Sequence, residues 1–560
     1  MPRMDTILKR LDVFPLVKHY ISELGLYELF EEFVPNDNNC DIPPAQVLCT
    51  MVVNIVVSAR PLYKIDEWLQ EYMDGVSESD ENSAKYNDDR LGRTLDALFC
   101  ADRNTLMALV SIAAIKVHQL IIETIHNDST SVSFAGAYNR QSLKAALIKY
   151  GFSKDHRPDY KQLVFGLNIT EDGHVPISYN LFDGNQADIT THIPNWDGLR
   201  NFLETEDFLY VADTKLFSSD NTSHIDKNGG RFITPMPKNR KEAKAFLKRL
   251  RQGEEIIWEI AYTQKNSRNK NETIIYKTYD QEKTQEGYII IWVHSSNKER
   301  RDRNTRTRRI TKAEKELKAI SSKLNKYTLK TREQIERAVS TACKDAKKFV
   351  TVEIVENQFI EKVKIGSGRR GPKSKYKNKK TITYDLQWSR NDEAIEQASK
   401  SDGIFPLVTN DASLSAAEVL RTYKKQPFLE KRFYTTKSVL EVAPVFLKKN
   451  ERIEAMMFLY FLGLMIVSLL ERNVRSQMLK AEIRNLPILP EGMNAKTPTW
   501  NNICYFFRAV HLAMITKSGK VIQSTVKGVT DLHEQVLRLL KVPSNVYNKL
   551  RDNWWLFEFQ

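Results

Sequence analysis

The sequence predicts an α/β protein whose core is interrupted by a strand-rich insertion and flanked by helical regions. Apolar residues recur at helical spacing up to about residue 125, and the period then changes to the two-residue alternation of strands. The apolar run "DFLYVAD", which ends at Asp213, is typical of a strand buried on both faces of a sheet. Strand-like runs with basic loops then occupy residues 246–395, and the core resumes at "DGIFPLVTN", residues 402–410.

A chain of 560 residues is too long for one ordinary core, so we expect several structural units. The changes in period and charge divide the chain into five parts. They are an acidic helical module at 1–115, the first part of the core at 116–245, a strand-rich basic insertion at 246–395, the second part of the core at 396–475, and a helical region at 476–560.

The N-terminal module and the core are predicted from the spacing of their apolar residues, which is helical in the module and alternating in the core. In "DIPPAQVLCTMVVNIVVSA" prolines precede a long apolar run, as they do in a first helical turn. Acidic side chains outnumber basic ones in this module, which favours a packing or dimerisation role over a role in gripping DNA. The expected core strands are "NDSTSVSFAGAY", "KQLVFGLNIT", "VPISYNLFDGN", "DFLYVAD" and "RFITPMP", with a crossover helix in "ADITTHIPNWDGLRNFLE".

The insertion combines strands with an unusual density of positive charge. Residues 296–380 hold 27 basic and 10 acidic side chains, which favours a phosphate-binding surface over a solvated linker. The basic segment "KERRDRNTRTRR" is followed by two expected helices, each opening with a capping box: Thr311 with Glu314, and Thr331 with Gln334.

The amino-acid composition argues against several classes of protein and favours others. The chain has 84 Lys and Arg against 70 Asp and Glu, a net charge of +14 that hints at a polyanionic partner. Its five cysteines form no CxxC pair, which argues against a zinc ribbon and a disulfide scaffold. The N-terminus has no apolar signal core, and the apolar run at residues 455–470 is short for a membrane span. We therefore expect a cytoplasmic protein without a membrane partner, in which this run is a buried core helix.

Three acidic residues are candidates for a metal site. Asp128 is expected at the start of the first core strand, Asp213 at the end of a buried strand, and Glu430 on a helix after the insertion. Two strand carboxylates and one helix carboxylate can hold two divalent cations roughly 4 Å apart for in-line phosphoryl displacement. Oxygen ligands favour Mg²⁺ or Mn²⁺ over zinc. Spacing alone leaves the ordinary alternative open, because an aspartate at a strand end is often a turn or cap residue.

An ordered series of motifs resembles bacterial insertion-sequence transposases of the DDE class, in the branch with a strand-rich insertion before the last carboxylate. That branch ends in a motif of Tyr, two residues, Arg, three residues, Glu, six residues, Lys, and Tyr423, Gln426, Glu430 and Lys437 stand at these spacings. Further matches are "YNDDRLGRTLDALF", "DSTSVSFAGAY", "GFSKDHRPDYKQLVFGL", "DGNQAD", "YVADTKL", "DGIFPLVTND" and the segment 444–475.

The resemblance implies an RNase H-like core in which Asp128, Asp213 and Glu430 bind two Mg²⁺ or Mn²⁺ ions. It also implies cleavage at the ends of an insertion sequence and joining of those ends to double-stranded target DNA. A homodimer would hold the two ends, and the protein would act in the cytoplasm at the bacterial nucleoid. If the matching positions have the same roles as in that family, the resemblance implies that Tyr423, Gln426 and Lys437 contact DNA near the cleaved end. Gln426 replaces the family's arginine and so lacks a fixed charge and a bidentate phosphate donor.

The remaining candidate DNA contacts are basic residues, and each has an ordinary structural alternative. Lys154 and Arg157 could grip phosphate, or Asp155 and Asp159 could neutralise them in a turn. Tyr423 could pack in a helix end, and Lys437 could be a plain surface lysine. In the insertion, the candidate phosphate ligands are Arg300, Arg301, Arg303, Arg306, Arg308 and Arg309.

Two other functions remain compatible with the same residues. One is a catalytically inactive DNA-binding protein on a transposase fold, against which the three intact carboxylates argue. The other is an RNase H-like nuclease that cleaves DNA without joining it, which the carboxylates do not distinguish from a transposase.

Overall fold

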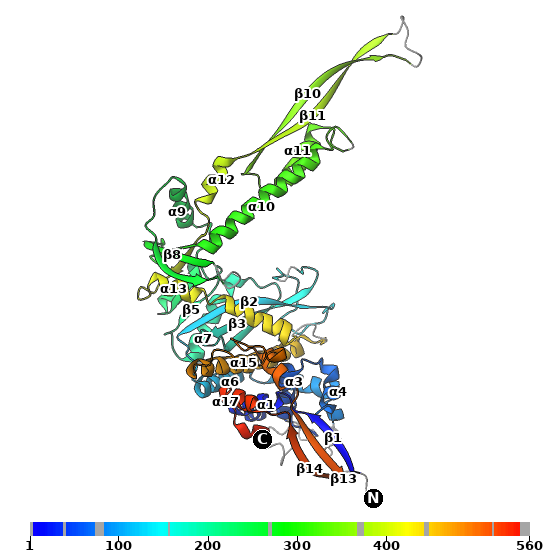
Figure 1. Ribbon diagram of the computed structural model, residues 1–560, viewed down its shortest axis with the longest axis vertical. Coiled ribbons are helices and arrows are strands. Elements are labelled where there is room, and N and C mark those ends of the chain that lie inside the picture. Colours follow the sequence, from blue (N-terminus) through cyan, green and yellow to red (C-terminus); the bar gives the residue numbers. More distant parts are fainter. Residues whose placement is uncertain are drawn as a thin grey trace. The chain divides into compact units, whose positions relative to one another are not determined.

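The computed structural model describes residues 4–36, 41–72, 83–154, 157–266, 272–326, 328–366, 375–441, 447–517 and 520–548 (Figure 1). The chain forms two compact units. The main unit comprises Met1–Thr234 and Arg421–Gln560, and the inserted unit comprises Pro235–Leu420. Each unit has its own buried apolar core. The chain is a mixed α/β protein, as its sequence predicts.

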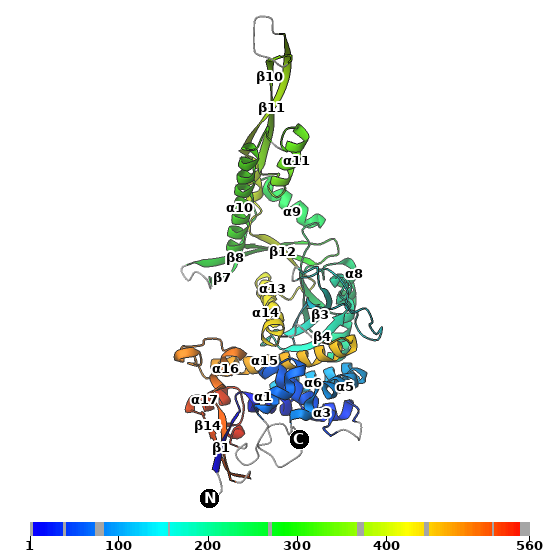
Figure 2. The ribbon, with the colours of Figure 1, turned by 90° about the vertical axis from the view of Figure 1, so that its right-hand side faces the viewer.

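A mixed sheet forms one layer of the main unit (Figure 2). The strand order is β4-β3-β2-β5-β6. Strands β2, β3 and β4 pair antiparallel, whereas β5 runs parallel to β2 and β6 runs parallel to β5. The strands are β2 (Thr124–Phe134), β3 (Lys161–Thr170), β4 (Pro176–Phe182), β5 (Leu209–Val211) and β6 (Arg231–Pro235). Helices α7 (His192–Leu203) and α8 (Ser219–Lys227) connect β4, β5 and β6.

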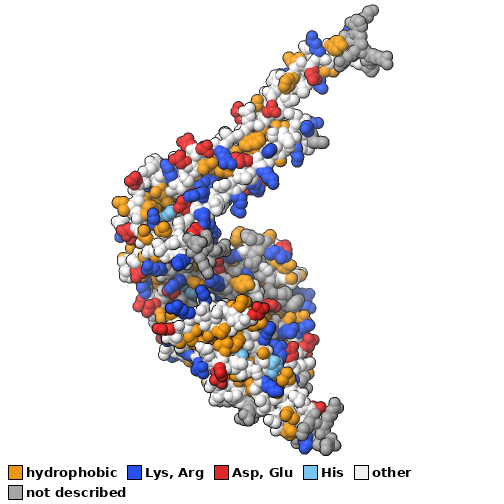
Figure 3. All heavy atoms as spheres, viewed as in Figure 1, with side chains coloured by type: hydrophobic (Ala, Val, Ile, Leu, Met, Phe, Trp, Pro, Cys, Tyr) orange, Lys and Arg blue, Asp and Glu red, His pale blue; other side chains and the backbone are white. Residues whose placement is uncertain are grey.

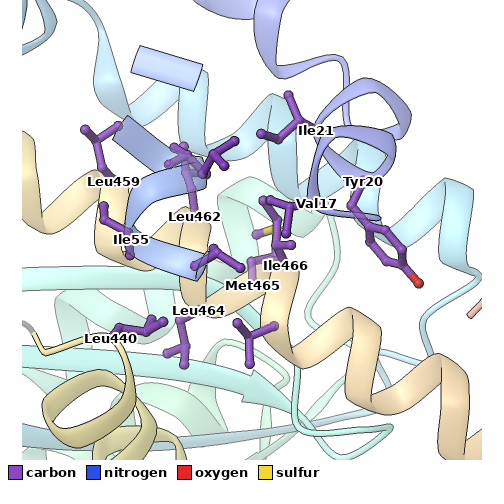
Figure 4. Packing of buried hydrophobic residues seen from close by; sticks show 14 of the residues in the cluster. Val17, Tyr20, Ile21, Ile55, Leu440, Leu459, Leu462, Leu464, Met465 and Ile466 are labelled. Atoms are coloured by element: carbon purple, nitrogen blue, oxygen red, sulfur yellow. The ribbon is translucent and has the colours of Figure 1, made fainter. Parts of the chain in front are cut away.

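One long helix, α15 (Asn450–Lys480), lies between this sheet and the N-terminal helices (Figures 1 and 2). It is long and apolar enough to cross a membrane, but 94% of its apolar window is buried inside the protein. Figure 4 shows Leu459, Leu462 and Met465 of α15 packed with Val17 and Ile55 of the N-terminal helices. The apolar run at residues 455–470 is therefore a core helix. The N-terminal helices are α1 (Phe14–Glu23), α2 (Leu26–Phe33), α3 (Pro44–Val57), α4 (Ile65–Gln70), α5 (Asp88–Cys100) and α6 (Arg103–His118).

A three-stranded sheet joins the first and last described parts of the chain. Strand β1 (Met4–Arg10) pairs antiparallel with β13 (His511–Lys517), which pairs with β14 (Lys520–Lys527). The sequence predicted helices in both regions. The alternation in β1 is short and mixed with charged residues, so its strand character depends on a partner about 500 residues away. The helices of the C-terminal region are α16 (Trp500–Phe507) and α17 (Asp531–Leu539).

The inserted unit is rich in strands, as expected. Its antiparallel strands follow the order β12-β9-β8-β7, and a separate hairpin is formed by β10 and β11. The elements are α9 (Lys241–Arg251), β7 (Glu259–Lys265), β8 (Thr273–Lys283), β9 (Ile289–Ser295), α10 (Ser296–Ser321), α11 (Arg332–Ala342), β10 (Val350–Lys364), β11 (Tyr376–Arg390), α12 (Asp392–Ser399) and β12 (Ile404–Thr409).

The helix prediction for the insertion needs one correction. The basic segment at 298–309 belongs to α10, which continues through Thr311 without a break. The N-cap of α10 is Ser295, whose side chain accepts a hydrogen bond from Lys298 N–H, so the predicted capping box at Thr311 is wrong. The second predicted box is confirmed, since Thr331 and Gln334 cap α11 reciprocally.

Candidate active site

Strand pairing brings Asp128 and Asp213 to the same level of the main-unit sheet. In the parallel pair β2–β5, Ile125 lies opposite Tyr210, and His126 lies opposite Val211. Continued two residues further, past the end of β5 at Val211, this register would place Asp128 level with Asp213. Asp128 lies within β2 rather than at its start, because Thr124–Asn127 extend the strand backwards. Asp213 lies two residues after the end of β5 at Val211, close to its predicted place at a strand end.

Burial perturbs both aspartates. It raises the pKa of Asp128 to about 6, an effect that the charges of Asp213 and Asp188 strengthen and the ammonium of Lys154 opposes. Burial also raises the pKa of Asp213, against the backbone N–H of Lys215 and the charge of Lys154. A bound cation would relieve the repulsion between two such carboxylates.

A third aspartate, Asp188, joins this pair, and sequence reasoning did not single it out. Its Oδ1 accepts a hydrogen bond from Ser129 Oγ at 2.8 Å. The Nζ of Lys154 lies 3.3 Å from Asp188 Oδ2 and 3.6 Å from Asp128 Oδ1. Lys154 also donates to the carbonyl oxygen of Ser129 at 2.7 Å. The ammonium of Lys154 thus lies among carboxylates rather than on an open surface. The motif "DGNQAD", which ends at Asp188, was the one sequence signal for this residue.

Two glycines allow the loops that carry Lys154 and Asp188 to approach each other closely. A Cβ on Gly151 would lie 1.9 Å from the carbonyl oxygen of Gly184, and a Cβ on Gly184 would lie 1.9 Å from that of Gln162. The Gln162 side chain donates to Gly184 O at 2.8 Å and to Phe152 O at 3.1 Å. Both loops are therefore fixed to the start of strand β3, which sets the position of Lys154 relative to Asp188.

A buried histidine, His192, lies beside Asp213. His192, at the start of α7, is 4% exposed, and its Nε2 lies 4.0 Å from Asp213 Oδ1. Its Nδ1 lies 3.3 Å from the hydroxyl of Tyr210, the β5 residue three positions before Asp213. Burial lowers the pKa of His192 to about 4, so the ring is neutral near pH 7. His192 was not predicted, since a lone histidine in a helix carries no recognisable signal.

Helix α14 (Pro427–Tyr434) carries Glu430 in its first turn. The helix begins at Pro427, since proline suits a first helical position. Gln426 fastens this end of the helix to β2, because its side chain donates to Asn127 O at 2.7 Å and its Oε1 lies 2.8 Å from His126 Nδ1. Glu430 is exposed and stands one turn beyond this anchor.

Arg432 holds the buried side of α14. Its guanidinium bonds Glu471 of α15 at 2.9 Å and the carbonyl oxygens of Gly173 and His174 at 2.9 and 2.8 Å. Every hydrogen bond of Arg432 therefore faces inward, and the side chain is 5% exposed. The imidazole of His174 stacks on Phe428 with ring centroids 4.1 Å apart. These contacts fix the rotation of α14 and leave Glu430 on the opposite, open side.

The hydroxyl of Tyr423 is affected by the charges of all three predicted carboxylates. Tyr423 ends α13 (Ala416–Tyr423), just before α14. The pKa of its hydroxyl rises to about 12, mainly through burial and further through the charges of Asp213, Asp128 and Glu430. One hydroxyl thus lies within electrostatic reach of all three acids. The hydroxyl keeps its proton near pH 7 and can serve as a neutral hydrogen-bond donor.

The donor set suits a hard divalent cation, because it consists of carboxylate oxygens. Within the described ranges, no three His, Cys, Asp or Glu side chains are close enough together to form a ready-made metal site. The ammonium of Lys154 compensates part of the negative charge of Asp128 and Asp188. These carboxylate oxygens could hold a divalent cation, and the ammonium of Lys154 stands among them.

The other predicted DNA contacts of the main unit differ in their surroundings. Lys154 and Gln426 are engaged internally, as described above. Arg157 bonds Asp159 through two nitrogens at 3.0 and 2.9 Å, as in the alternative of a neutralised turn. Asp155, the other acid of that alternative, lies outside the described residues. Lys437 is half-buried in a short π-helical segment, Thr435–Val439, that continues α14.

The predicted arginines of the insertion fall into distinct groups along α10. Arg306 is buried and forms two hydrogen bonds with Asp402 at 2.8 and 2.7 Å, so its prediction as a phosphate ligand is corrected: it is a structural residue. Arg300 pairs with Glu272, and Arg303 pairs with Glu299 at 2.8 Å. Arg301, Arg308 and Arg309 are exposed.

Comparisons with known proteins give limited results. Residues 6–112 match a family described as a domain of unknown function, DUF4277. No curated protein matches the chain. Among solved structures, the chain is similar to one described as the cryo-EM structure of a piggyBac transposase synaptic complex with hairpin DNA. The match has a TM-score of 0.35 and 8% sequence identity, and it covers 96% of this chain and 84% of that one.

Proposed function

We propose that the protein is a metal-dependent DNA transposase of the DDE class, with Asp128, Asp213 and Glu430 as its metal ligands. The observation that carries the proposal is that β2, which holds Asp128, pairs with β5, which leads to Asp213, and that Gln426 fastens the start of the Glu430 helix to β2. The charges of all three acids also raise the pKa of the Tyr423 hydroxyl, which supports this placement. The ordered motifs of the sequence support the transposase class.

We also propose that the main-unit sheet is an RNase H-like core. Its order of three antiparallel strands followed by two parallel strands supports this, as do a carboxylate on β2 and another just after the adjacent strand β5. Such a core would hold Mg²⁺ or Mn²⁺ through Asp128, Asp213 and Glu430, with Asp188 as a further oxygen donor.

Each side chain has a defined task in this proposal. Two bound cations would activate the attacking hydroxyl and stabilise the leaving oxygen. The carboxylates supply the negative charge that retains the cations, and α14 fixes the position of Glu430. Tyr423 donates its hydroxyl hydrogen to a phosphate oxygen of the cleaved strand. Lys154 balances the carboxylates until the site is loaded. Two DNA ends require two active sites, so we expect a homodimer on DNA.

The test is Glu430→Gln in the full chain, assayed with supercoiled plasmid carrying candidate insertion-sequence ends in Mg²⁺ or Mn²⁺. We expect cleavage to fall by about a hundredfold or more, with DNA binding and thermal stability retained. The matched control is Glu393→Gln, which removes the same charge from the first turn of α12 and should cleave normally. Normal cleavage by Glu430→Gln would show that the metal assignment is wrong.

A second assay separates the transposase from a nuclease. Pre-cut ends with free 3′-hydroxyls are mixed with target plasmid, and a joined product supports the transposase. Cleavage of intact ends without any joined product would favour the nuclease. DNA binding with neither reaction would favour an inactive DNA-binding protein.

A further inference from the structure

One face of helix α10 carries exposed basic and polar side chains. The helix runs through 26 residues, Ser296–Ser321. Positions three, four and seven apart lie on the same side of a helix, so its exposed residues form a continuous stripe about 21 Å long. We call this stripe the outward face of α10. It consists of Arg301, Asn304, Arg308, Thr311, Lys312 and Lys315.

The opposite side of α10 fixes the orientation of this face. Ile310, Ala313 and Leu317 are buried in a core with residues of α11 and β10. Arg306 lies on the same buried side and pairs with Asp402. These residues recur at helical spacing half a turn away from the stripe. The apolar core and the buried ion pair therefore hold the outward face toward solvent.

The acidic side chains of α10 lie beside the outward face, and they have partners. Glu299 pairs with Arg303 at 2.8 Å, and Asp302 pairs with Lys298 at 2.5 Å. Glu314 forms two hydrogen bonds with Arg390 of β11. Among the described residues, no carboxylate oxygen lies within 4.0 Å of the charged nitrogens of Arg301, Arg308 or Lys315. Lys312 lies 3.9 Å from Glu316. The helix thus concentrates uncompensated positive charge on one side (Figure 3).

We propose that the outward face of α10 is a binding surface for duplex DNA, with the helix lying along a groove. This inference rests on the proposed function and specifies which surface of the inserted unit holds the substrate. A single α-helix fits the major groove, where arginine and asparagine side chains can reach base edges. Arg301, Lys312 and Lys315 bind phosphates near the two ends of the stripe, while Asn304 and Arg308 face the bases at its centre.

Charge complementarity favours DNA as the occupant. Four cationic side chains along about 21 Å of helix match the regular phosphate charge of a duplex. An alternative occupant is an acidic protein surface, such as the N-terminal module of a second copy. Asn304, Thr307 and Thr311 lie along the same depression as Arg308 and Lys312, and their neutral donors and acceptors are typical of base and phosphate contacts.

The test compares two double variants of the full chain. Arg301→Gln with Arg308→Gln removes two charges from the outward face. Arg300→Gln with Arg303→Gln removes two charges from the flank of the same helix, where both arginines already have carboxylate partners. Binding to a duplex oligonucleotide is measured in EDTA over a range of salt concentrations. We expect the outward-face variant to reduce the slope of log affinity against log salt by about 1.8, and the flank variant to leave it nearly unchanged.

Equal slopes for the two variants would overturn the inference, because the effect would then come from net charge alone. A salt-dependent loss of self-association in the outward-face variant, with its DNA slope unchanged, would assign the face to a second copy and also overturn it. Circular dichroism checks that both variants fold. Because the assay needs no metal or cleavage, its outcome is independent of the Glu430 test. Either proposal can therefore fail while the other stands.

Discussion

Asp128 retains a proton at a pH where ordinary aspartates have lost theirs. The pKa of its folded form is about 6, whereas that of an unfolded aspartate is near 4. Between these values the folded chain binds more protons than the unfolded chain, so ionisation of Asp128 lowers stability as pH rises through this window. Above about pH 6 the carboxylate is charged and available to a cation.

We therefore predict that Mn²⁺ raises the melting temperature of the protein more at about pH 7.5 than at about pH 5. A proton competes with the cation for Asp128 at the lower pH. Differential scanning fluorimetry with and without Mn²⁺ measures the effect, and Asp128→Asn should abolish most of it. A Mn²⁺ shift that is the same at both pH values would contradict this role of Asp128.

Lys154 supplies a second prediction at the same scale. Lys154→Met removes the ammonium that lies among the carboxylates. We expect tighter Mn²⁺ binding by calorimetry, because a competing cation is gone, and a metal-free protein destabilised by about 1 kcal/mol. The control is Lys149→Met, which breaks a 2.8 Å pair with Asp183 instead. Its Mn²⁺ affinity should match that of the unaltered chain. Weaker Mn²⁺ binding by Lys154→Met would mean that Lys154 helps to organise the site.

The sequence predicts the three candidate acids, Lys154 and Gln426, but not the contacts that these residues make with one another. Asp128, Asp213 and Glu430 stand within recognisable motifs. The contacts of Asp188 with Ser129 and of Lys154 with both aspartates arise only when loops far apart in the sequence cross at Gly151 and Gly184. No local pattern encodes such a crossing. The same holds for Gln426, whose partners lie 299 and 300 residues away.

Helix α14 depends on one buried ion pair for its placement. Arg432 is 5% exposed and Glu471 is 10% exposed. Loss of one partner leaves an uncompensated buried charge, which costs about 3–5 kcal/mol. We predict that Arg432→Met lowers the free energy of unfolding by this amount in urea titrations. Arg432→Lys should recover part of the loss, since it restores the charge but not all the hydrogen bonds.

A paired double variant checks the cause. Arg432→Met combined with Glu471→Met removes both charges and should be more stable than Arg432→Met alone. If the double variant were less stable than the single one by a full further increment, packing rather than the ion pair would hold α14.

At the scale of elements, the sequence predicts the strands of the core sheet better than those of the terminal sheet. Strand β3 matches the predicted run "KQLVFGLNIT" from end to end. In contrast, β1, β13 and β14 were missed, because their pairing partners are distant in the sequence. The sequence places the arginine-rich start of α10 before the helix rather than in it, since its few apolar residues make the helical period weak.

The whole chain contains two units with separate cores, and all the proposed metal ligands belong to the main unit. We predict two calorimetric transitions, of which Mn²⁺ raises only the one from the main unit. Arg306→Met breaks the buried pair with Asp402 and should lower only the other transition. A single transition that responds to both changes would show that the units unfold together.

The main unit is assembled from both sides of the insertion, and this has a consequence during synthesis. The hydroxyl of Tyr20 donates to the carbonyl oxygen of Leu540, and β1 pairs with β13. A ribosome that adds about 5–20 residues per second needs roughly 25 to 100 s to pass from β1 to β13. The inserted unit, Pro235–Leu420, lies wholly between these two strands in the sequence. A nascent chain can therefore fold its inserted unit while the main unit still lacks β13.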